Sequence, residues 1–259
     1  TVRSAPDGYT LLLGTIGPLA INPTLYGNLA FDPLKDLTPV SLVGEVPNVL
    51  AVPADRPYRS VADIIAAAKA RPEALNFGSS GIGSAGHLAA EQLNLMAGIR
   101  TTHVPYRGGG ALLPELVAGR VDYAFTTALN GIPQAEAGKL RILGVPNGKR
   151  VPLLPDIPTI AESGLPGFDG VDWAALMAPP GLPAPILAKL NAAMQSVLKE
   201  AELVAAMASR RLVLEARRAS AARKGPRGLY ADPDGTRRTV ASPQRRRRSR
   251  HACARRGER

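Results

Sequence analysis

The sequence predicts an α/β fold with a parallel-rich sheet flanked by helices. Between residues 60 and 145, short apolar runs alternate with segments of helical spacing, and this order is typical of crossover connections and parallel pairing. The apolar runs are short and continuous, as in strands buried on both faces. Hydrophobic residues make up 45% of the 259 residues but aromatic residues only 4%, a composition that fits a core rich in Ala, Leu and Val.

The first sixty residues are expected to contain three strands and one interrupted segment. Pro18 and Pro23 interrupt the segment after the first strand, so this segment is expected to be loop and short helix. In order, the expected elements are a strand at Tyr9–Gly14, the interrupted segment at 15–26, and strands at Leu37–Val43 and Val49–Val52.

The middle and later parts of the chain alternate helices and strands. Ser60 and Asp63 form a capping-box pattern at the start of the first helix. The elements that follow are expected at Ile64–Ala70 (helix), Leu75–Phe77 (strand), 84–97 (helix), Thr101–Val104 (strand), Ala111–Ala118 (helix), Val121–Phe125 (strand), Ile132–Ala137 (helix), Leu140–Val145 (strand), Ile160–Gly164 (short helix), Val171–Ala178 (strand), Pro185–Leu198 (amphipathic helix) and Leu203–Met207 (its extension or successor).

A glycine- and serine-rich turn at 78–86 joins a predicted strand to a predicted helix. Glycines permit positive φ angles and close approach of a ligand to the backbone, and Ser84 is a suitable N-cap. The first amides of a helix lack intrahelical partners and carry partial positive charge, so this turn could hold an anion without using a charged side chain. The turn matches neither a Walker loop nor the dinucleotide fingerprint. A purely structural turn is an equal alternative from this segment alone.

Charge is concentrated at the C-terminal end. The whole chain carries a net +11, but residues 210–259 alone carry +13, so residues 1–209 carry −2. We expect the arginine-rich tail to be disordered and without specific nucleic-acid binding, because no interleaved aromatic residues accompany it. The single Cys253 excludes an internal disulfide. No run is long enough to span a membrane. The opening residues Thr1-Val2-Arg3-Ser4 do not have the pattern of a signal peptide, and because the first residue is not Met we expect this sequence to be a fragment or a mature piece.

Several motifs occur in a fixed order along residues 6–215. They are Pro6-Asp7-Gly8-Tyr9-Thr10, Ile21-Asn22-Pro23-Thr24-Leu25-Tyr26, Phe31-Asp32-Pro33, Gly78-Ser79-Ser80-Gly81, Gly83-Ser84, Gly86-His87-Leu88, His103-Val104-Pro105-Tyr106-Arg107-Gly108, Leu116, Gly119, Val121-Asp122 and Pro155-Asp156-Ile157-Pro158-Thr159. Together they closely resemble the Bug family, the substrate-binding proteins of tripartite tricarboxylate transporters.

This resemblance implies a two-lobed, type II periplasmic binding protein that closes on a small carboxylate. It places 1–47 in lobe one, 48–170 in lobe two, 171–215 back in lobe one, and 216–259 in the tail. The implied partners are the carboxylate and the membrane subunits of the transporter, with the receptor expected to be a monomer in the periplasm. In the family, a strand and loop upstream of Pro6 supply ligand contacts, so lobe one of this sequence is expected to be incomplete. The arginine-rich end departs from the family pattern and is interpreted as an out-of-frame or badly predicted terminus.

The candidate ligand-binding residues lie where predicted strands end. The turn at 78–86 supplies the strongest candidates. A second glycine turn is expected at Tyr106–Gly110, and its Arg107 could pair with a carboxylate, although a surface arginine is an equal interpretation. The complete candidate set is Thr15, Gly17, Ser79, Ser80, Gly83, Ser84, Tyr106, Arg107, Gly108 and Thr126. Asp122 is expected to cap or pair, and Trp173 to pack in the core or at the hinge.

No Ser/His/Asp set, carboxylate pair or metal cluster has supporting spacing, so no catalytic residue, metal or cofactor is expected. An effector-binding domain of a LysR-type regulator shares this two-lobed fold and is the alternative interpretation. It would need a helix-turn-helix, and none precedes Pro6 in this sequence. An enzyme acting on a phosphate ester is disfavoured because no acid/base pair is present.

Overall fold

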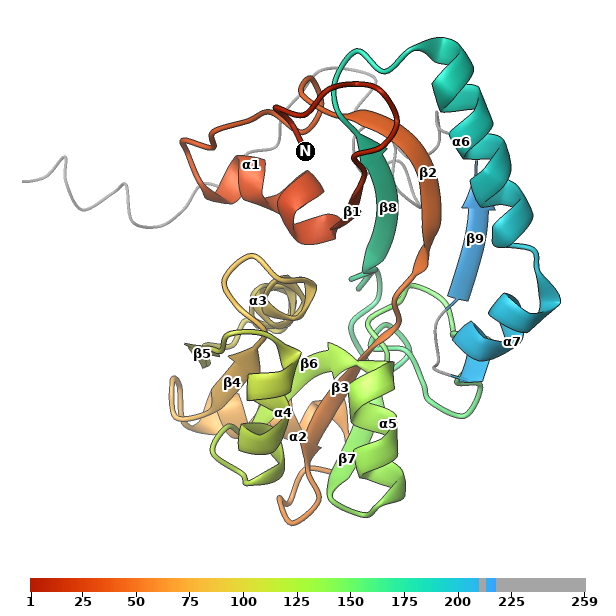
Figure 1. Cartoon of the computed structure of the whole chain (residues 1–259). Coiled ribbons are helices and arrows are strands. Elements are labelled where there is room, and N and C mark those ends of the chain that lie inside the picture. The colour runs from red at the N-terminus through yellow and green to blue at the C-terminus, as the bar shows by residue number, and fades with distance from the viewer. Residues whose placement is uncertain (210–212, 218–259) are drawn as a thin grey trace, which may run out of the picture.

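The computed structural model describes residues 1–209 and 213–217, and within them the chain forms two lobes, each built on one β-sheet (Figure 1). Lobe one contains the sheet with strand order β1-β8-β2-β9, in which each neighbouring pair is antiparallel. Its elements are β1 (Leu12–Thr15), a π-helical turn η1 (Gly17–Ile21), α1 (Asn22–Leu25), β2 (Thr38–Glu45), β8 (Trp173–Ala178), α6 (Ala184–Val197), α7 (Ala201–Ser209) and β9 (Val213–Arg217).

Lobe two contains a five-stranded sheet with the order β5-β4-β6-β3-β7. Its elements are β3 (Asn48–Pro53), α2 (Val61–Ala70), β4 (Asn76–Ser79), α3 (Ala85–Ala97), β5 (Thr102–Pro105), α4 (Gly109–Val117), β6 (Tyr123–Thr127), α5 (Ala128–Glu136) and β7 (Leu140–Gly144). Strand β4 pairs in parallel with β5 and β6, whereas β3 pairs antiparallel with β6 and β7. Four strands therefore run in one direction and β3 runs against them.

The α/β, two-lobed prediction is confirmed, but strand pairing is more mixed than helix–strand alternation suggests. Alternation would pair β7 directly with a parallel neighbour. Instead β3, which enters from lobe one, occupies the position between β6 and β7. In lobe one the strands come from segments far apart in the chain, so no local crossover enforces parallel pairing there.

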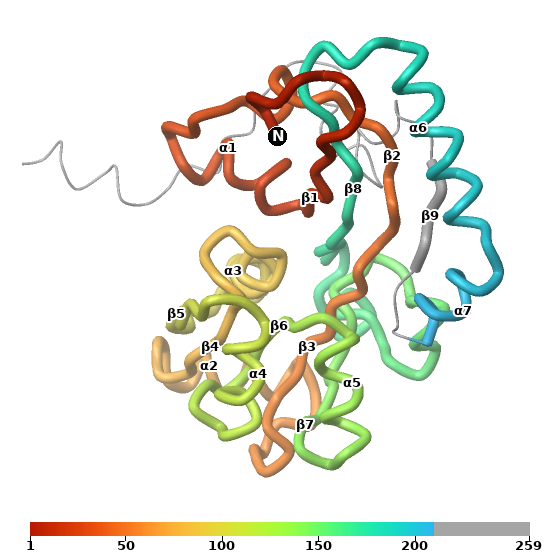
Figure 2. Tube along the Cα trace, viewed as in Figure 1, coloured from red at the N-terminus to blue at the C-terminus, as the bar shows by residue number. Residues whose placement is uncertain are grey.

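Two extended segments connect the lobes, as the tube in Figure 2 shows. The chain leaves the first sheet after Glu45 and enters the second at Asn48, and it returns to the first sheet at Trp173. The backbone N–H of Val46 donates to the carbonyl oxygen of Asp172 over 3.0 Å. The two connecting segments are therefore bonded to each other at the junction of the lobes.

Local signals in the sequence set several helix boundaries. The predicted capping box is present, because the Ser60 hydroxyl accepts from the Asp63 amide and the Asp63 carboxylate accepts from the Ser60 amide. The Ser84 hydroxyl accepts from the amide of His87 and caps α3. Gly98, with a φ of 62°, ends that helix in the left-handed conformation.

Other expectations need correction. The first strand begins at Leu12 rather than Tyr9, whose side chain is 93% exposed. Pro18 and Pro23 occupy first-turn positions of η1 and α1, where the missing N–H is tolerated, so they begin these turns instead of interrupting them. Residues 160–164 form turns and no helix.

Strand β9 was not predicted, and it includes residues 216 and 217 of the expected tail. It pairs with β2, so its place in the sheet depends on a contact with a segment about 170 residues earlier. The remaining expected tail, residues 218–259, lies outside the described residues.

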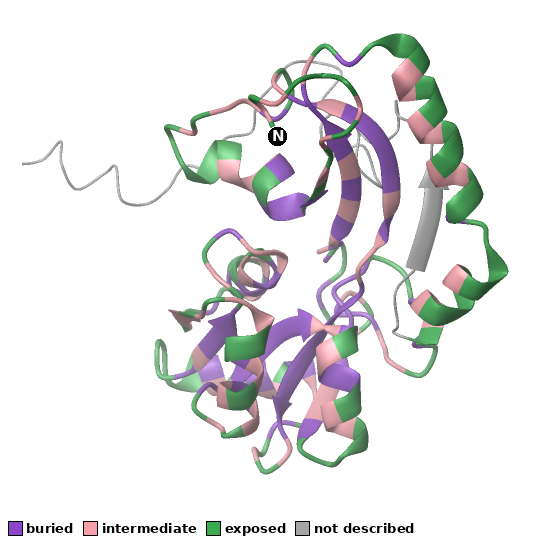
Figure 3. Ribbon diagram, viewed as in Figure 1, coloured by how far each residue is buried: buried purple, intermediate pink, exposed green. Residues whose placement is uncertain are grey.

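Each lobe has its own core. In lobe two the largest cluster gathers Phe77, Tyr123, Phe125 and Phe168 between the sheet and its helices. In lobe one Trp173 is fully buried with Leu42 and other residues, which confirms its expected packing role. Figure 3 shows the buried residues along the strands of both sheets, while α6 turns an exposed face outward.

Candidate functional site

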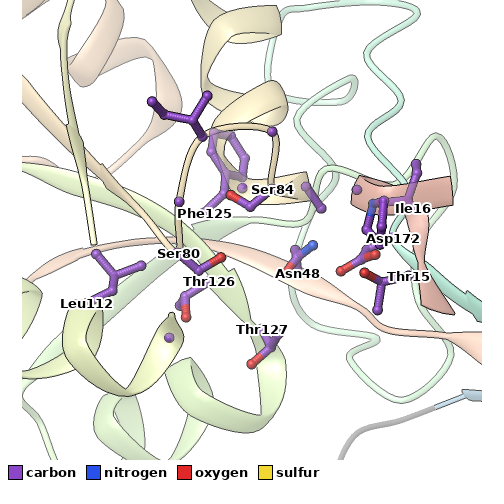
Figure 4. Close-up of a pocket in the computed structure, with 18 of the residues that line it drawn as sticks. Thr15, Ile16, Asn48, Ser80, Ser84, Leu112, Phe125, Thr126, Thr127 and Asp172 are labelled. Atoms are coloured by element: carbon purple, nitrogen blue, oxygen red, sulfur yellow. The ribbon is translucent and has the colours of Figure 1, made fainter. Parts of the chain in front are cut away.

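A cavity of about 420 Å³ lies between the two lobes (Figure 4). Lobe one contributes residues that follow β1, and lobe two contributes the ends of β4 and β6 and the glycine turns. The lining residues are Thr15, Ile16, Gly17, Pro18, Asn22, Asn48, Ser80, Gly81, Ile82, Gly83, Ser84, Ala85, Gly86, Gly109, Leu112, Phe125, Thr126, Thr127, Asn130 and Asp172. The cavity is thus shared between segments far apart in the sequence.

Helix N-termini converge on this cavity. The N-caps of α3 and α5, Ser84 and Thr127, both line it, and so does Gly109, the first residue of α4. From lobe one, the start of η1 at Gly17 also lines it. Each helix start presents amides without intrahelical partners and adds partial positive charge. The cavity is therefore suited to an anion, although no Lys, Arg or His is among the described residues that line it.

Four buried polar side-chain atoms at this cavity have no hydrogen-bond partner among the described residues. They are Asn22 Oδ1, Asn48 Nδ2, Thr127 Oγ1 and Asp172 Oδ1. Buried polar groups in folded proteins are nearly always hydrogen-bonded, since leaving one unpaired costs about 1–3 kcal/mol. Unpaired atoms gathered around one cavity indicate partners other than the described residues.

Asp172 is the only ionisable side chain among the described lining residues. Burial raises the pKa of its carboxyl group to about 6, and the Trp173 backbone and the nearby Asn48 side chain oppose the rise. Its position, immediately before β8, places it on the returning segment that connects the lobes. In Figure 4 it lies beside Thr15, with Asn48 between it and the serines of lobe two.

Six of the ten predicted site residues line the cavity together. They are Thr15, Gly17, Ser80, Gly83, Ser84 and Thr126. The other four lie elsewhere: Ser79 is fully buried behind the turn, Tyr106 packs against the cluster around Leu112, Arg107 is exposed, and Gly108 caps α4 without lining the cavity. For the second glycine turn, only the next residue, Gly109, reaches the cavity.

Ser79 belongs to a closed polar cluster behind the glycine turn. Its hydroxyl lies 2.6 Å from His103 Nε2 and 3.1 Å from both the amide and the carbonyl oxygen of Gly81. The rings of His87 and His103 stack with centroids 4.1 Å apart, and Phe77 stacks on His103. The Ser79 hydroxyl is therefore already committed to positioning the turn.

The two histidines are held neutral by their surroundings. The amide of Gly83 donates to His87 Nδ1 over 3.2 Å, which requires that nitrogen to be unprotonated. Burial lowers the pKa of His87, and Glu91 opposes this shift. Burial, followed by the charge of His87, lowers the pKa of His103 to about 4. Both rings thus act as neutral supports for the turn at physiological pH.

The glycines of the turn have two different roles. Gly81 and Gly83 adopt φ angles of 133° and 79°, which favour glycine. Gly78 and Gly86 have no positive φ, but a Cβ on them would lie 2.4 Å from Leu112 Cδ1 and 2.3 Å from the Phe125 carbonyl oxygen respectively. Two glycines therefore shape the backbone and two allow close packing.

The site residues that sequence reasoning missed are mostly amides and acids outside the glycine turns. They are Asn22, Asn48, Thr127, Asn130 and Asp172. Thr127 directly follows a predicted site residue, so the strand end could have identified it. Asn48 and Asp172 lie beside the expected crossings between lobes, but nothing local indicates that their side chains meet in a cavity.

The described residues contain neither a metal-binding cluster nor a membrane-spanning helix. Among residues 1–209 and 213–217, no group of three or more His, Cys, Asp and Glu side chains is arranged to hold a metal ion. Within the same residues, every helix falls short of the length and hydropathy needed to cross a bilayer.

Asp122 accepts from the Asn76 amide over 2.8 Å and pairs with Arg56 at 3.6 Å, which confirms its expected structural role.

Residues 1–217 match the family model described as the tripartite tricarboxylate transporter family receptor, TctC. A UPF0065 protein from Pseudomonas sp. (strain P51), from the tcbD-tcbE intergenic region, is 37% identical over 80% of this chain and 62% of its own length. Protein BugT of Bordetella pertussis is 34% identical over 93% of this chain and 70% of its own length. The chain spans about 60% of the length of several curated relatives that it matches.

Solved structures agree with the family match. Rpa4515 of R. palustris, determined with adipate, superposes with a TM-score of 0.80 at 36% identity and covers 85% of this chain and 73% of its own. MatC (Rpa3494) from Rhodopseudomonas palustris, determined with malate, gives 0.75 at 34% identity, with 82% and 72% covered. The family match extends over the described part of the chain, and these structures share its two-lobed fold. The chain therefore belongs to the family of tripartite tricarboxylate transporter receptors, TctC.

Proposed function

We propose that this chain captures a small carboxylate in the cavity between its lobes, as the extracytoplasmic receptor of a tripartite tricarboxylate transporter. The observation that carries this proposal is a cavity on which helix N-termini converge and where two buried donors, Asn48 Nδ2 and Thr127 Oγ1, have no hydrogen-bond partner among the described residues. Relatives determined with adipate and malate support a carboxylate as the ligand class.

Helix dipoles and hydroxyl groups are proposed to bind the carboxylate. The Ser84 hydroxyl accepts from the His87 amide, so its own proton is free to donate to a ligand oxygen. The first amides of α3 can donate to the same anion, and so can the amides that follow Ala128 in α5, whereas the Ala128 amide already donates to the Pro47 carbonyl oxygen. Ser80 and Thr126 add hydroxyl groups at the ends of β4 and β6. Neutral donors suffice because the low dielectric between closed lobes would strengthen each of these interactions.

Capture further requires that the ligand favour the closed arrangement of the lobes. Thr15 and Gly17 of lobe one face Ser80 and Gly83 of lobe two across the cavity. A ligand that bonds to both sides stabilises closure by the contacts that the second lobe adds. The closed complex would then be the form that the membrane subunits of the transporter recognise.

The location and assembly state belong to the same proposal. A receptor of this class would work in the periplasm, and relatives solved as a periplasmic transporter protein and as the periplasmic binding protein BugD support this placement. We propose that it acts as a monomer that meets the membrane subunits after closure. No catalytic step is proposed.

Calorimetric titration of the full chain with malate and adipate tests this function. Ser84→Ala should weaken binding about tenfold to hundredfold, the range for one hydrogen bond to a charged acceptor. Ser196→Ala, on the exposed side of α6, is the matched control and should leave affinity unchanged. Absence of heat with every di- and tricarboxylate, or equal affinity of the Ser84 variant and the wild type, would refute the proposed site.

A further inference from the structure

Asp172 is an unusual residue to find in a cavity suited to an anion. Its carboxylate lines the same space as the N-termini of α3 and α5, yet a bound carboxylate would repel it. Its Oδ1 is buried and has no hydrogen-bond partner among the described residues. An aspartate without a counterion in this position needs a reason.

None of the described residues that line the cavity with Asp172 carries a positive charge. The described side chains that share the cavity with it are neutral, and Lys, Arg and His are absent from this lining set. Asn48 lies beside it and, like the Trp173 backbone, lowers the pKa of its carboxyl group, but both are neutral donors and neither compensates its charge. Burial raises the pKa of Asp172 only to about 6, so the group is ionised at neutral pH.

The cavity therefore has two electrostatically different ends. Lobe two presents helix N-termini and hydroxyl groups that favour a negative group. At the junction of the lobes, Asp172 favours a positive group, because a buried carboxylate is stabilised by a hydrogen-bonded cation. A single small molecule that carries both charges would satisfy both ends.

We infer that Asp172 is a specificity-determining residue that selects an amino carboxylate, whose ammonium group bonds to Asp172 while its carboxylate lies at the α3 and α5 N-termini. This inference rests on the proposed carboxylate-binding function and specifies its ligand class. A neutral hydroxyl substituent could also donate to Asp172, but it would leave the charge of the aspartate uncompensated. The ammonium group supplies both the hydrogen bond and the opposite charge.

Calorimetry with matched ligand pairs tests this inference. The pairs are succinate with aspartate and adipate with 2-aminoadipate, which differ only by the amino group, titrated at pH 7.5 into the full chain. The wild type should bind the aminated member of at least one pair about tenfold to hundredfold more tightly, as expected for one charge-assisted hydrogen bond. Asp172→Asn should remove or reverse that preference.

Two control variants separate the effect of the site from general effects. Asp156→Asn removes the same charge from an exposed loop of lobe two and should keep the wild-type preference. Asp172→Ser repeats the test with a smaller neutral side chain, and thermal unfolding verifies that each variant is folded.

The possible failures are distinguishable. Tight binding of the parent dicarboxylates without preference for their aminated partners would overturn the role of Asp172 and leave the proposed function intact. An unchanged preference in both Asp172 variants would do the same. Binding of no ligand by the folded wild type would overturn the proposed function and this inference together.

Discussion

Two polar clusters lie on opposite sides of the same glycine turn, and they differ in one respect. Behind the turn, Ser79 and His103 satisfy each other and the Gly81 backbone. In front of it, Thr127 and Asp172 present buried oxygens that no described residue satisfies. Both clusters combine buried hydroxyl and ionisable groups, so residue type does not distinguish them.

The difference shows how a supporting cluster and a binding surface can be told apart without a bound ligand. A closed network stabilises the folded chain and gains nothing from a ligand. An open set of polar atoms costs stability in the free protein, and a ligand that bonds to them recovers that cost. Substitutions in the two clusters should therefore change stability in opposite directions.

The largest expected effect is stabilisation by Asp172→Asn. A pKa raised from 3.8 to about 6 corresponds to about 3 kcal/mol of destabilisation of the free protein at neutral pH. The isosteric amide should return much of this, so the free energy of unfolding without ligand should rise by about 2–3 kcal/mol. Chemical denaturation at pH 7.5 measures it, with Asp156→Asn as the control. A variant less stable than the wild type would mean that Asp172 has a stabilising partner.

Ser79→Ala should act in the opposite direction. It removes the hydroxyl that bonds to His103 and to the Gly81 amide, and it leaves these buried groups unpaired. We expect a loss of about 1–3 kcal/mol of stability. Ser80→Ala, one residue further and in the cavity, should cost little stability and reduce carboxylate affinity. If the Ser79 variant were as stable as the wild type and fully folded but bound the carboxylate more weakly, Ser79 would belong to the binding site.

Thr127→Val should produce a smaller change in stability and a clear change in affinity. The hydroxyl is buried with no partner among the described residues, and valine has the same shape, so the free energy of unfolding should rise by less than about 1 kcal/mol. Carboxylate affinity should fall up to about tenfold. Thr101→Val is the matched comparison, because that hydroxyl bonds to Asn94 and Tyr123 and its loss should reduce stability. Equal stability losses in both variants would remove the distinction between the clusters.

The smallest expected effect is the net pH dependence of the wild type between pH 6 and 4. The folded-state pKa of Asp172 is raised, so this group adds stability as pH falls through 6 towards 4. The folded-state pKa of His103 is lowered to about 4, so this group removes stability over pH 6.5 to 4, and His87 acts in the same direction. The two contributions oppose each other. Solvent also weakens the histidine contribution, because these rings are only partly buried.

Single variants should reveal each contribution to this pH dependence. Melting temperatures of Asp172→Asn should fall on acidification more steeply than those of the wild type. His103→Gln, which keeps a polar partner for Ser79, should show the reverse. If the melting temperatures of all three proteins changed with pH in the same way, neither Asp172 nor His103 would titrate as its surroundings indicate.

The sequence was sufficient to predict elements that depend on local chemistry. The capping box at Ser60 and the N-cap at Ser84 are determined by side chains within one turn, and the structure confirms both. Strand β9 could not be predicted, because its pairing with β2 is a long-range contact in a segment without apolar periodicity. The position of β3 between β6 and β7 depends on how the lobes connect, which helix–strand alternation does not encode.

The site likewise contains residues that the sequence predicts and residues that it does not. Ser80, Gly83 and Thr126 follow predicted strands, and strand ends identify the correct edge of the sheet. Ser79 and Ser80 are neighbours of the same type, yet Ser79 ends β4 and bonds to His103 and Gly81 whereas Ser80 lines the cavity, so residue type alone does not tell them apart. Asp172 escaped notice because its meeting with Asn48 requires two segments separated by more than one hundred residues.

Gly83 determines how closely the lobes can meet. A Cβ at this position would lie 2.7 Å from Asn22 Oδ1 and 2.9 Å from Leu25 Cδ2, both on α1 of lobe one. Any larger residue at 83 would collide with α1 and hold the two lobes slightly apart, without contacting the core of either lobe. Such a variant should still bind the ligand to one lobe, but its lobes should be unable to close around the ligand. Substitution of Gly83 thus offers a way to separate initial ligand binding from closure of the lobes within one protein.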